Sequence, residues 1–417
     1  MTGGGRMNGE NRIPADPGIG DETLLRAAAH FGTPLFVYDE GVLRRKWERL
    51  RNLLPPCVDI LYSVKANPAV DVIAAFAALG CGFDVASQGE AAAVSLAGGN
   101  HAKSVWVGPG KSEGDLRFAA GAGIGVLAVE SEGEFGRVCK IAEERPFPPL
   151  VALRLNPGGG GGSLSMSGAT QFGADFDTAV KLLSKESGRK VEISGVHGYL
   201  GTGLLDARKL AANMGLVLRE AERLQRATGR LLSFVDAGGG FGVPLYPGDA
   251  PLDEEILTEE LYDLFGRYLD RHPWTEGLFV ESGRFLTAEA GVMVARVLDV
   301  KRVHGRNFAI VDGGINAIGG RDGYLGSKHP PLRILGKEGE GDTPYTVCGP
   351  LCTPMDRLAV NVRLREPKEG DLVAFYMAGA YGPSASPGRF LCRGFPEEVI
   401  FRGGGLTRCR TVWGGGA

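Results

Sequence analysis

The sequence predicts a (β/α)8 barrel, similar to a TIM barrel, followed by a C-terminal all-β domain. Two patterns support this fold class. Between residues 58 and 282, eight short apolar segments alternate with amphipathic stretches, and parallel strands need such crossover helices. After residue 289, strand-like segments follow one another without long helices between them. The length of 417 residues also favours two domains, because single domains seldom grow beyond about 300 residues.

We expect four segments along the chain. Residues 1–20 form a flexible glycine-rich tail, and residues 21–40 form an N-terminal segment whose strand at 34–38 could pair with the β domain. The barrel occupies residues 41–288 and the β domain residues 289–417. The apolar segments predict barrel strands near residues 58–63, 82–86, 104–108, 124–129, 149–155, 193–199, 232–236 and 278–282. In the β domain they predict strands near residues 292–300, 308–311, 345–348, 371–377 and 397–401.

Composition excludes several classes of function. The net charge of −3 gives no basic field for nucleic acid or an anionic membrane. Seven scattered cysteines contain no CxxC pair, so we expect no metal site and no disulfide framework. No apolar stretch approaches the roughly 18 residues of a membrane span, and the start does not resemble a signal peptide. A cytoplasmic enzyme is therefore the expectation.

Polar residues and glycines follow nearly every predicted barrel strand, where the catalytic residues of such barrels gather. Lys65 follows the first strand in Tyr62-Ser-Val-Lys-Ala-Asn-Pro68. A lone lysine is usually a surface residue, but this setting suits a buried amine that forms a Schiff base. Glu281 ends the eighth strand and is either a solvated charge or a partner for a protonated cofactor ring nitrogen.

The glycine run Gly238–Gly242 follows the seventh strand, and Gly283-Arg284 follow the eighth. A glycine run alone usually marks a turn, but at these two strand ends it occupies the phosphate pocket of many barrels. In the β domain, Cys352 lies between polar residues and proline and is a candidate for proton transfer. Tyr381, between glycines, either belongs to a plain turn or presents its hydroxyl to phosphate.

Together these motifs resemble the fold-type III pyridoxal-phosphate (PLP) decarboxylases, the family of ornithine, diaminopimelate and arginine decarboxylases with an alanine-racemase-like barrel. The resemblance covers residues 30–405 in order. It implies PLP as cofactor, Lys65 as the Schiff-base lysine, and Cys352 as the proton donor, reaching in from the partner subunit of a homodimer. It also implies cofactor contacts from Asp84, Arg154, His197, Tyr199, Thr202, Gly238, Gly239, Gly240, Glu281, Gly283, Arg284 and Tyr381, with Glu90 beside them.

One departure from the family concerns the cofactor ring. Ornithine-decarboxylase-like members carry a histidine just before the Gly-Ser of the sixth strand, stacked on the ring. In this chain that position is Tyr199, and His197 lies two residues earlier. Either Tyr199 stacks on the ring or His197 reaches it, and the sequence leaves both open.

A second departure concerns the substrate, to which the resemblance assigns Arg321, Thr353 and Asp356. Members acting on diamino acids carry Asp or Glu directly after the reactive cysteine, where this chain has Thr353. The Cys348–Asp356 string looks more like the subgroup of carrier-protein-bound glutamate decarboxylase and the exosortase-associated decarboxylases. We therefore expect a substrate without a free distal ammonium, unless another acid such as Asp322 replaces the missing one.

The resemblance implies decarboxylation of an amino acid or amino-acid conjugate, possibly bound to a carrier protein, in secondary-metabolite biosynthesis. A free diamino-acid decarboxylase is the main alternative. An amino-acid racemase would need a base on the opposite face of the substrate, and the Cys352 motif argues against it. A non-catalytic regulatory homologue is disfavoured because Lys65, Glu281, Cys352 and Tyr381 are all present.

Overall fold

The computed structural model describes residues 18–144, 146–147, 149–158, 164–184, 190–246, 248–319, 329–337, 339 and 341–412. The chain forms two compact units. The barrel unit comprises residues 44–243, 252–286 and those from 410 onwards. The sheet unit comprises residues up to 43, together with 244–251 and 287–409.

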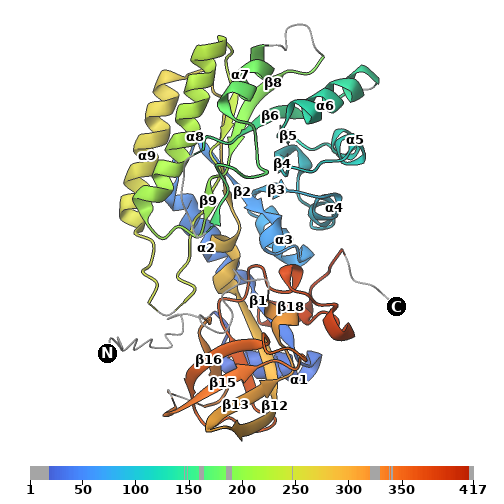
Figure 1. Ribbon diagram of the computed structural model, residues 1–417, viewed down its shortest axis with the longest axis vertical. Coiled ribbons are helices and arrows are strands. Elements are labelled where there is room, and N and C mark those ends of the chain that lie inside the picture. Colours follow the sequence, from blue (N-terminus) through green and yellow to red (C-terminus); the bar gives the residue numbers. More distant parts are fainter. Residues whose placement is uncertain are drawn as a thin grey trace. The chain divides into compact units, whose positions relative to one another are not determined.

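The barrel unit contains a closed barrel of eight parallel strands, which confirms the predicted fold class (Figure 1). The strands close in the order β10-β11-β2-β3-β4-β5-β6-β8. Their bounds are β2 Val58–Ser63, β3 Gly82–Val85, β4 Ser104–Trp106, β5 Val126–Val129, β6 Leu150–Leu155, β8 Ile193–Gly198, β10 Phe234–Asp236 and β11 Gly277–Ser282. Two short strands, β7 Leu164–Ser165 and β9 Gly201–Thr202, pair with each other outside the barrel.

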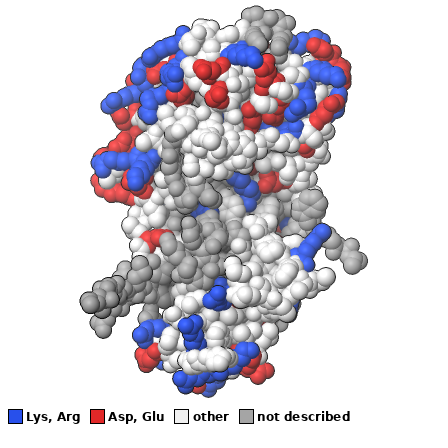
Figure 2. Space-filling model, viewed as in Figure 1, with Lys and Arg blue, Asp and Glu red and all other residues white. Residues whose placement is uncertain are grey.

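Helices connect the strands and cover the barrel. They are α2 Glu40–Leu53, α3 Val70–Ala77, α4 Gln88–Leu96, α5 Glu113–Ala122, α6 Glu132–Glu144, α7 Phe176–Ser184, α8 Ala207–Thr228, α9 Glu254–Arg271 and α10 Arg284–Thr287. Side chains in the sequence fix several of their starts. Ser112 and Asp115 form a capping box at α5, and Asp206 caps α8 by accepting the Lys209 N–H. Figure 2 shows acidic and basic side chains intermingled in the upper part of the view and at its lower end.

The sheet unit is built around a nine-stranded sheet whose main path is β16-β15-β13-β12-β1-β18-β19. Its elements are α1 Asp21–Phe31, β1 Leu35–Asp39, β12 Gly291–Val303, β13 Arg306–Val311, α11 Ile315–Ile318, β14 Leu332–Ile334, β15 Thr343–Cys348, β16 Arg357–Leu364, β17 Leu372–Phe375, β18 Glu397–Arg402 and β19 Gly405–Arg408. Strand β1 pairs with β12 and β18, so the N-terminal strand joins this sheet. The sequence did not predict β14, β16 or β19, because these strands are short or alternate with charged residues. None of the described helices is long and apolar enough to cross a membrane.

Candidate active site

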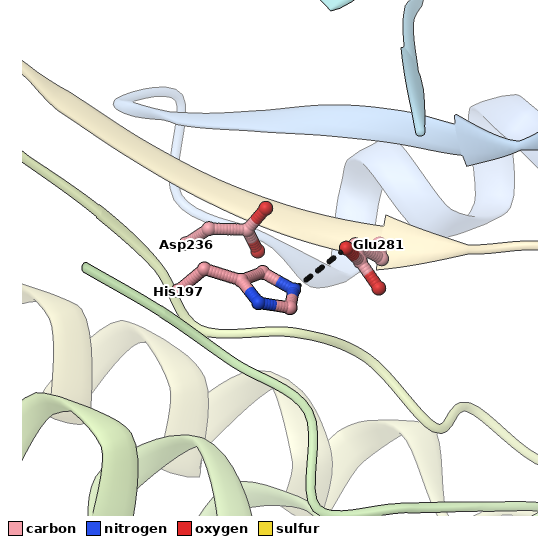
Figure 3. Close-up of side chains that lie close together, drawn as sticks. All are labelled: His197, Asp236 and Glu281. Carbon is pink, nitrogen blue, oxygen red and sulfur yellow. Dashed lines mark hydrogen bonds and ion pairs between the residues drawn. The ribbon is translucent and has the colours of Figure 1, made fainter. Parts of the chain in front are cut away.

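A layer of polar side chains lies inside the barrel, next to its apolar core. Phe234 on β10 and Phe279 on β11 contact each other edge to face, with ring centroids 6.2 Å apart. Alternate residues of a strand point to the same side, so Asp236 and Glu281, two residues further along, also face the interior. His197 on β8 is the register partner of Asp236. Figure 3 shows the three polar side chains converging from their strands.

His197 and Glu281 form a buried ion pair. The Nε2–H of His197 donates to Oε1 of Glu281 over 3.0 Å, and the residues are 1% and 2% exposed. Burial alone would raise the pKa of Glu281, but the charges of His197 and Lys65 oppose it and lower that pKa to about 2. Burial would lower the pKa of His197, but the negative charge and the hydrogen bond of Glu281 have the larger effect and raise that pKa. The pair therefore favours an ionised glutamate and a protonated imidazole.

Asp236 completes the cluster. Its Oδ1 accepts the N–H of Gly238 over 2.9 Å, and burial, followed by the charge of Glu281, raises its pKa to about 7. One polar side-chain atom from each of His197, Asp236 and Glu281 lies within 4.8 Å of the other two. Metal sites also use such spacing, but here the imidazole nitrogen and the Glu281 oxygen already satisfy each other by a hydrogen bond.

Lys65 lies in the short helix Val64–Ala66 that directly follows β2. Its Nζ is 2.5 Å from Oδ2 of Asp84, a buried residue on β3. The Lys65 side chain is 39% exposed, so the expectation of a buried amine was wrong. The reason is local: the strand ends before the lysine, and a buried aspartate holds the amine at the open end of the barrel. An accessible amine beside a carboxylate remains suited to covalent chemistry.

The turn after β10 brings backbone close to backbone. Gly238 has φ +70° and Gly240 φ +107°, and a Cβ on Gly239 would lie 1.9 Å from the carbonyl oxygen of Glu281. Only glycine fits such a turn without strain. Over the described part of the chain, the N–H groups of Gly239 and Gly240 donate no hydrogen bond. Two free amides in one turn are suited to binding an anion.

Comparison with known proteins identifies the family. The model of the pyridoxal-dependent decarboxylases, pyridoxal binding domain, matches residues 40–288. The chain is 33% identical to an L-glutamyl-(acyl-carrier protein) decarboxylase of Niallia circulans over 91% of each chain. It is 31% identical to a diaminopimelate decarboxylase of Neisseria meningitidis serogroup A, over 91% of this chain and 92% of that one. The crystal structure of a diaminopimelate decarboxylase from M. jannaschii superposes with a TM-score of 0.84 at 25% identity, covering 93% and 92% of the two chains.

The chain belongs to the pyridoxal-dependent decarboxylase family. It is a PLP-dependent carboxy-lyase, which confirms the predicted class of enzyme and cofactor. The barrel of this decarboxylase fits the cofactor by its own geometry: a turn with free amides, an ionised buried carboxylate and an accessible lysine amine share one end of the barrel. Bound PLP supplies an electron sink for the electron pair that remains when the substrate loses its carboxylate.

Tyr199 and His197, the two candidates for contact with the cofactor ring, lie in different places in the decarboxylase. Tyr199 is half-buried, and its ring centroid lies 5.7 Å from Nζ of Lys65. His197 is fully buried and bound to Glu281. Tyr199 is therefore the one beside the lysine amine. Thr202 lies nearby in sequence on β9, paired with Leu164.

The sequence did not reveal Glu130, which holds Arg154. The Glu130 carboxylate accepts Nη1–H of Arg154 over 2.9 Å and the N–H groups of Gly108 and Gly173 over 3.0 and 2.9 Å. The Arg154 guanidinium also lies 4.6 Å from the ring centroid of Phe172. Glu130 directly follows β5, the fourth barrel strand, so a search of that strand end would have found it.

The predicted residues Cys352, Thr353, Asp356 and Tyr381 belong to the sheet unit, whereas Gly283 and Arg284 belong to the barrel unit. Cys352 is exposed, and Thr353 is half-buried and accepts the Met355 N–H over 3.3 Å. Asp356 is 3% exposed, and its two carboxylate oxygens accept the N–H groups of Ile315 and Leu351, each over 2.7 Å. It therefore anchors residues 349–356, which we call the Cys352 loop. Tyr381 has a positive φ of 54°. Arg321 and Asp322 lie outside the described residues.

Proposed function

We propose that this enzyme decarboxylates a conjugated amino acid, most simply an acidic or neutral one carried on a protein, and not a free diamino acid. The observation that carries this proposal is Thr353, which offers a neutral hydroxyl directly after Cys352. A buried ammonium without a counter-charge costs several kcal/mol. The 33% identity to a decarboxylase of a carrier-bound glutamyl group supports the same class of substrate.

In the proposed site, Lys65 attaches the cofactor covalently and Asp84 holds its amine. Glu281 accepts a hydrogen bond from the cofactor ring nitrogen and keeps that nitrogen protonated, because a fixed anion stabilises the protonated form. Tyr199 faces the ring. The cofactor phosphate contacts Gly238, Gly239, Gly240, Gly283, Arg284, Thr202 and Tyr381, and Arg154 lines the same end of the barrel.

Cys352 supplies the proton that the substrate carbon takes up after CO2 has left. A thiol is a suitable donor because its ordinary pKa is near neutrality. Since both Asp356 oxygens are held by backbone N–H groups, we assign Asp356 to fixing the Cys352 loop and not to direct substrate contact. Arg321 and Thr353 keep their proposed roles in substrate binding.

We further propose a homodimer in which Cys352 serves the partner's barrel. Large apolar side chains are exposed at two places on the sheet unit. Met355 in the Cys352 loop is 70% exposed, and in the segment 389–395 Phe395 is 60% exposed, with Phe390 and Leu391 also exposed. Exposed apolar patches mark interaction surfaces. The seven cysteines are free in the structure, which suits a cytoplasmic enzyme. A role in secondary-metabolite biosynthesis belongs to the same proposal.

A free diamino-acid decarboxylase is the second candidate, favoured by the 31% identity to a diaminopimelate decarboxylase. One assay separates the two. The holoenzyme is incubated with free glutamate, ornithine, lysine and diaminopimelate and with glutamyl thioesters on carrier protein, and CO2 loss is scored by mass. Preference for a carrier-linked substrate supports the proposal. A kcat/KM of about 10⁴ M⁻¹s⁻¹ or more for a free diamino acid would contradict it.

A further inference from the structure

The buried pair of His197 and Glu281 has features that a simple hydrogen bond does not require. Both side chains are almost fully inaccessible, although each belongs to the polar layer of the barrel. Nδ1 of His197 and Oδ2 of Asp236 are buried without a hydrogen-bond partner among the described residues. Such unsatisfied polar atoms are costly, so their presence inside the barrel calls for a functional explanation.

Ionisable side chains on β3, β6 and β10, and Lys65 directly after β2, interact electrostatically with this pair. Asp84 on β3 and Asp236 on β10 are two further carboxyl groups near Glu281. A negative charge on one such group raises the pKa of its acidic neighbours. Two cations oppose them, but each already has a carboxylate partner: Lys65 pairs with Asp84, and Arg154 on β6 pairs with Glu130. His197 is in direct contact with Glu281 over 3.0 Å, and the contact raises the pKa of the imidazole, which favours its charged form. Its charge is therefore the main local term that favours an ionised Glu281.

We infer that His197 is a positioning residue whose positive charge, and not merely its hydrogen bond, keeps Glu281 ionised and oriented toward the ring nitrogen of the cofactor. This inference rests on the proposed role of Glu281. It adds a requirement that the role alone does not contain: a neutral donor at position 197 would hold the Glu281 side chain in place but would leave it prone to protonation. Glutamate in an apolar, acid-rich site takes up a proton at neutral pH.

Two substitutions separate charge from hydrogen bonding. His197→Gln keeps an N–H donor of similar reach without the charge, and His197→Phe removes both while filling the space. His272→Gln is the matched control, because His272 is also buried in the barrel unit and lies 3.7 Å from a carboxylate, Glu222, that the proposed site does not use. Circular dichroism and thermal melting establish that each holoenzyme is folded.

The first measurement is the visible absorption spectrum of each holoenzyme without substrate, between about pH 6 and pH 9, the range in which histidine and perturbed carboxylates change charge. We expect constant spectra for the unmodified enzyme and His272→Gln. For both His197 variants we expect a pH-dependent change of the cofactor band whose midpoint falls within that range. If His197→Gln keeps the unmodified spectrum, the hydrogen bond suffices and the inference is wrong.

A second measurement needs no cofactor and decides the matter if His197→Phe does not fold. The imidazole nitrogen resonances of the apoprotein are recorded by NMR, and the His197 signals are those missing from His197→Gln. A cationic ring at pH 8 supports the inference, and a neutral ring at pH 7 overturns it. Glu281→Gln tests the underlying role separately: an unchanged holoenzyme spectrum in that variant would remove Glu281 from the ring nitrogen, whatever the charge of His197.

Discussion

The polar layer of the barrel and the Cys352 loop of the sheet unit are built in opposite ways. In the barrel, His197, Asp236 and Glu281 come from adjacent strands and are almost fully buried, and His197 is hydrogen-bonded to Glu281. In the loop, Asp356 fixes the backbone, whereas Cys352 itself is exposed. Rigid strands hold charges at fixed distances, and a loop with a fixed backbone presents side chains that can change without disturbing the fold.

This contrast explains a division of labour within the proposed site. Binding an anionic, aromatic cofactor needs fixed charges, which the barrel supplies through Lys65, Glu281 and the glycine turn. Substrate choice needs a side chain that differs between related enzymes, and the loop supplies Thr353 for it, next to Cys352 as the proposed proton donor. Substitutions in the two regions should therefore fail in different ways, and the following predictions test that expectation.

The largest effect is expected at Lys65 in the barrel. Lys65→Ala removes the amine that forms the covalent bond, so turnover should fall by at least about 10³-fold and borohydride should no longer fix cofactor to the protein. Absorbance and peptide mapping after reduction provide the measurement, with Lys103→Ala as a surface-lysine control. Labelling of a different lysine in the unmodified enzyme would remove Lys65 from the site.

A smaller and different effect is expected at Cys352. Cys352→Ala should leave the cofactor spectrum unchanged and slow product formation by about 10²-fold, the usual value of one positioned proton donor. The proton should then add more often to the cofactor carbon, which yields an aldehyde and pyridoxamine phosphate. Product analysis by mass spectrometry measures the ratio, and Cys57→Ala, at another exposed cysteine, is the control. Unchanged rate and ratio would exclude Cys352 from the mechanism.

The neighbouring position should change specificity and leave the chemistry intact. Thr353→Asp supplies a carboxylate for a distal ammonium, so kcat/KM for a free diamino acid should rise by roughly tenfold, equivalent to about 1.4 kcal/mol. Thr353→Asn is the neutral control and should show no such gain. Equal values for the Asp and Asn variants would mean that the distal group of the substrate does not meet this residue.

The barrel was more predictable from the sequence than the loop. Alternating apolar segments located all eight barrel strands, because parallel strands buried on both faces give continuous apolar runs. The strand-end rule also led to Lys65, Glu281 and Gly238. The hydrogen bond between His197 and Glu281 could not be predicted, since it depends on register between β8, β10 and β11, which local patterns do not encode. Glu130 was missed although it follows a strand end.

In the sheet unit, local patterns were weaker. Strand β16 mixes buried apolar residues with exposed polar and charged ones, as a strand with one solvent-facing side does, and no long apolar run marked it. The role of Asp356 was also beyond local reasoning, because its carboxylate binds the N–H of Ile315, which is 41 residues away in sequence. Contacts of this kind depend on the tertiary fold.

The last and smallest prediction compares two buried aspartates, one from each region. Asp236 in the barrel uses one oxygen for the Gly238 N–H and leaves the other without a partner, so Asp236→Asn can keep the bond and lose a buried acid. Burial raises the pKa of Asp236 from 3.8 to about 7. The contribution of this group to the free energy of unfolding is therefore greatest below pH 3.8, its pKa in the unfolded chain, and is lost as the pH rises through 7. At pH 8 the Asp236→Asn variant should therefore melt a few degrees higher than the unmodified protein, since each kcal/mol of stability shifts the melting temperature by about 2 to 4 °C. Near pH 4 the two proteins should melt at the same temperature.

Asp356 should show the opposite sign at neutral pH. Both its oxygens accept backbone N–H groups, so Asp356→Asn places an amide NH2 against one of them and leaves that donor unsatisfied, at a cost of about 1 to 3 kcal/mol. Thermal unfolding of the two Asn variants beside the unmodified protein at pH 8 tests the pair. Lower melting temperatures for both variants would mean that the barrel aspartate is held by bonds as firmly as the loop aspartate. The proposed difference between the two regions, charged groups in the barrel layer and a hydrogen-bonded aspartate in the Cys352 loop, would then not hold for Asp236.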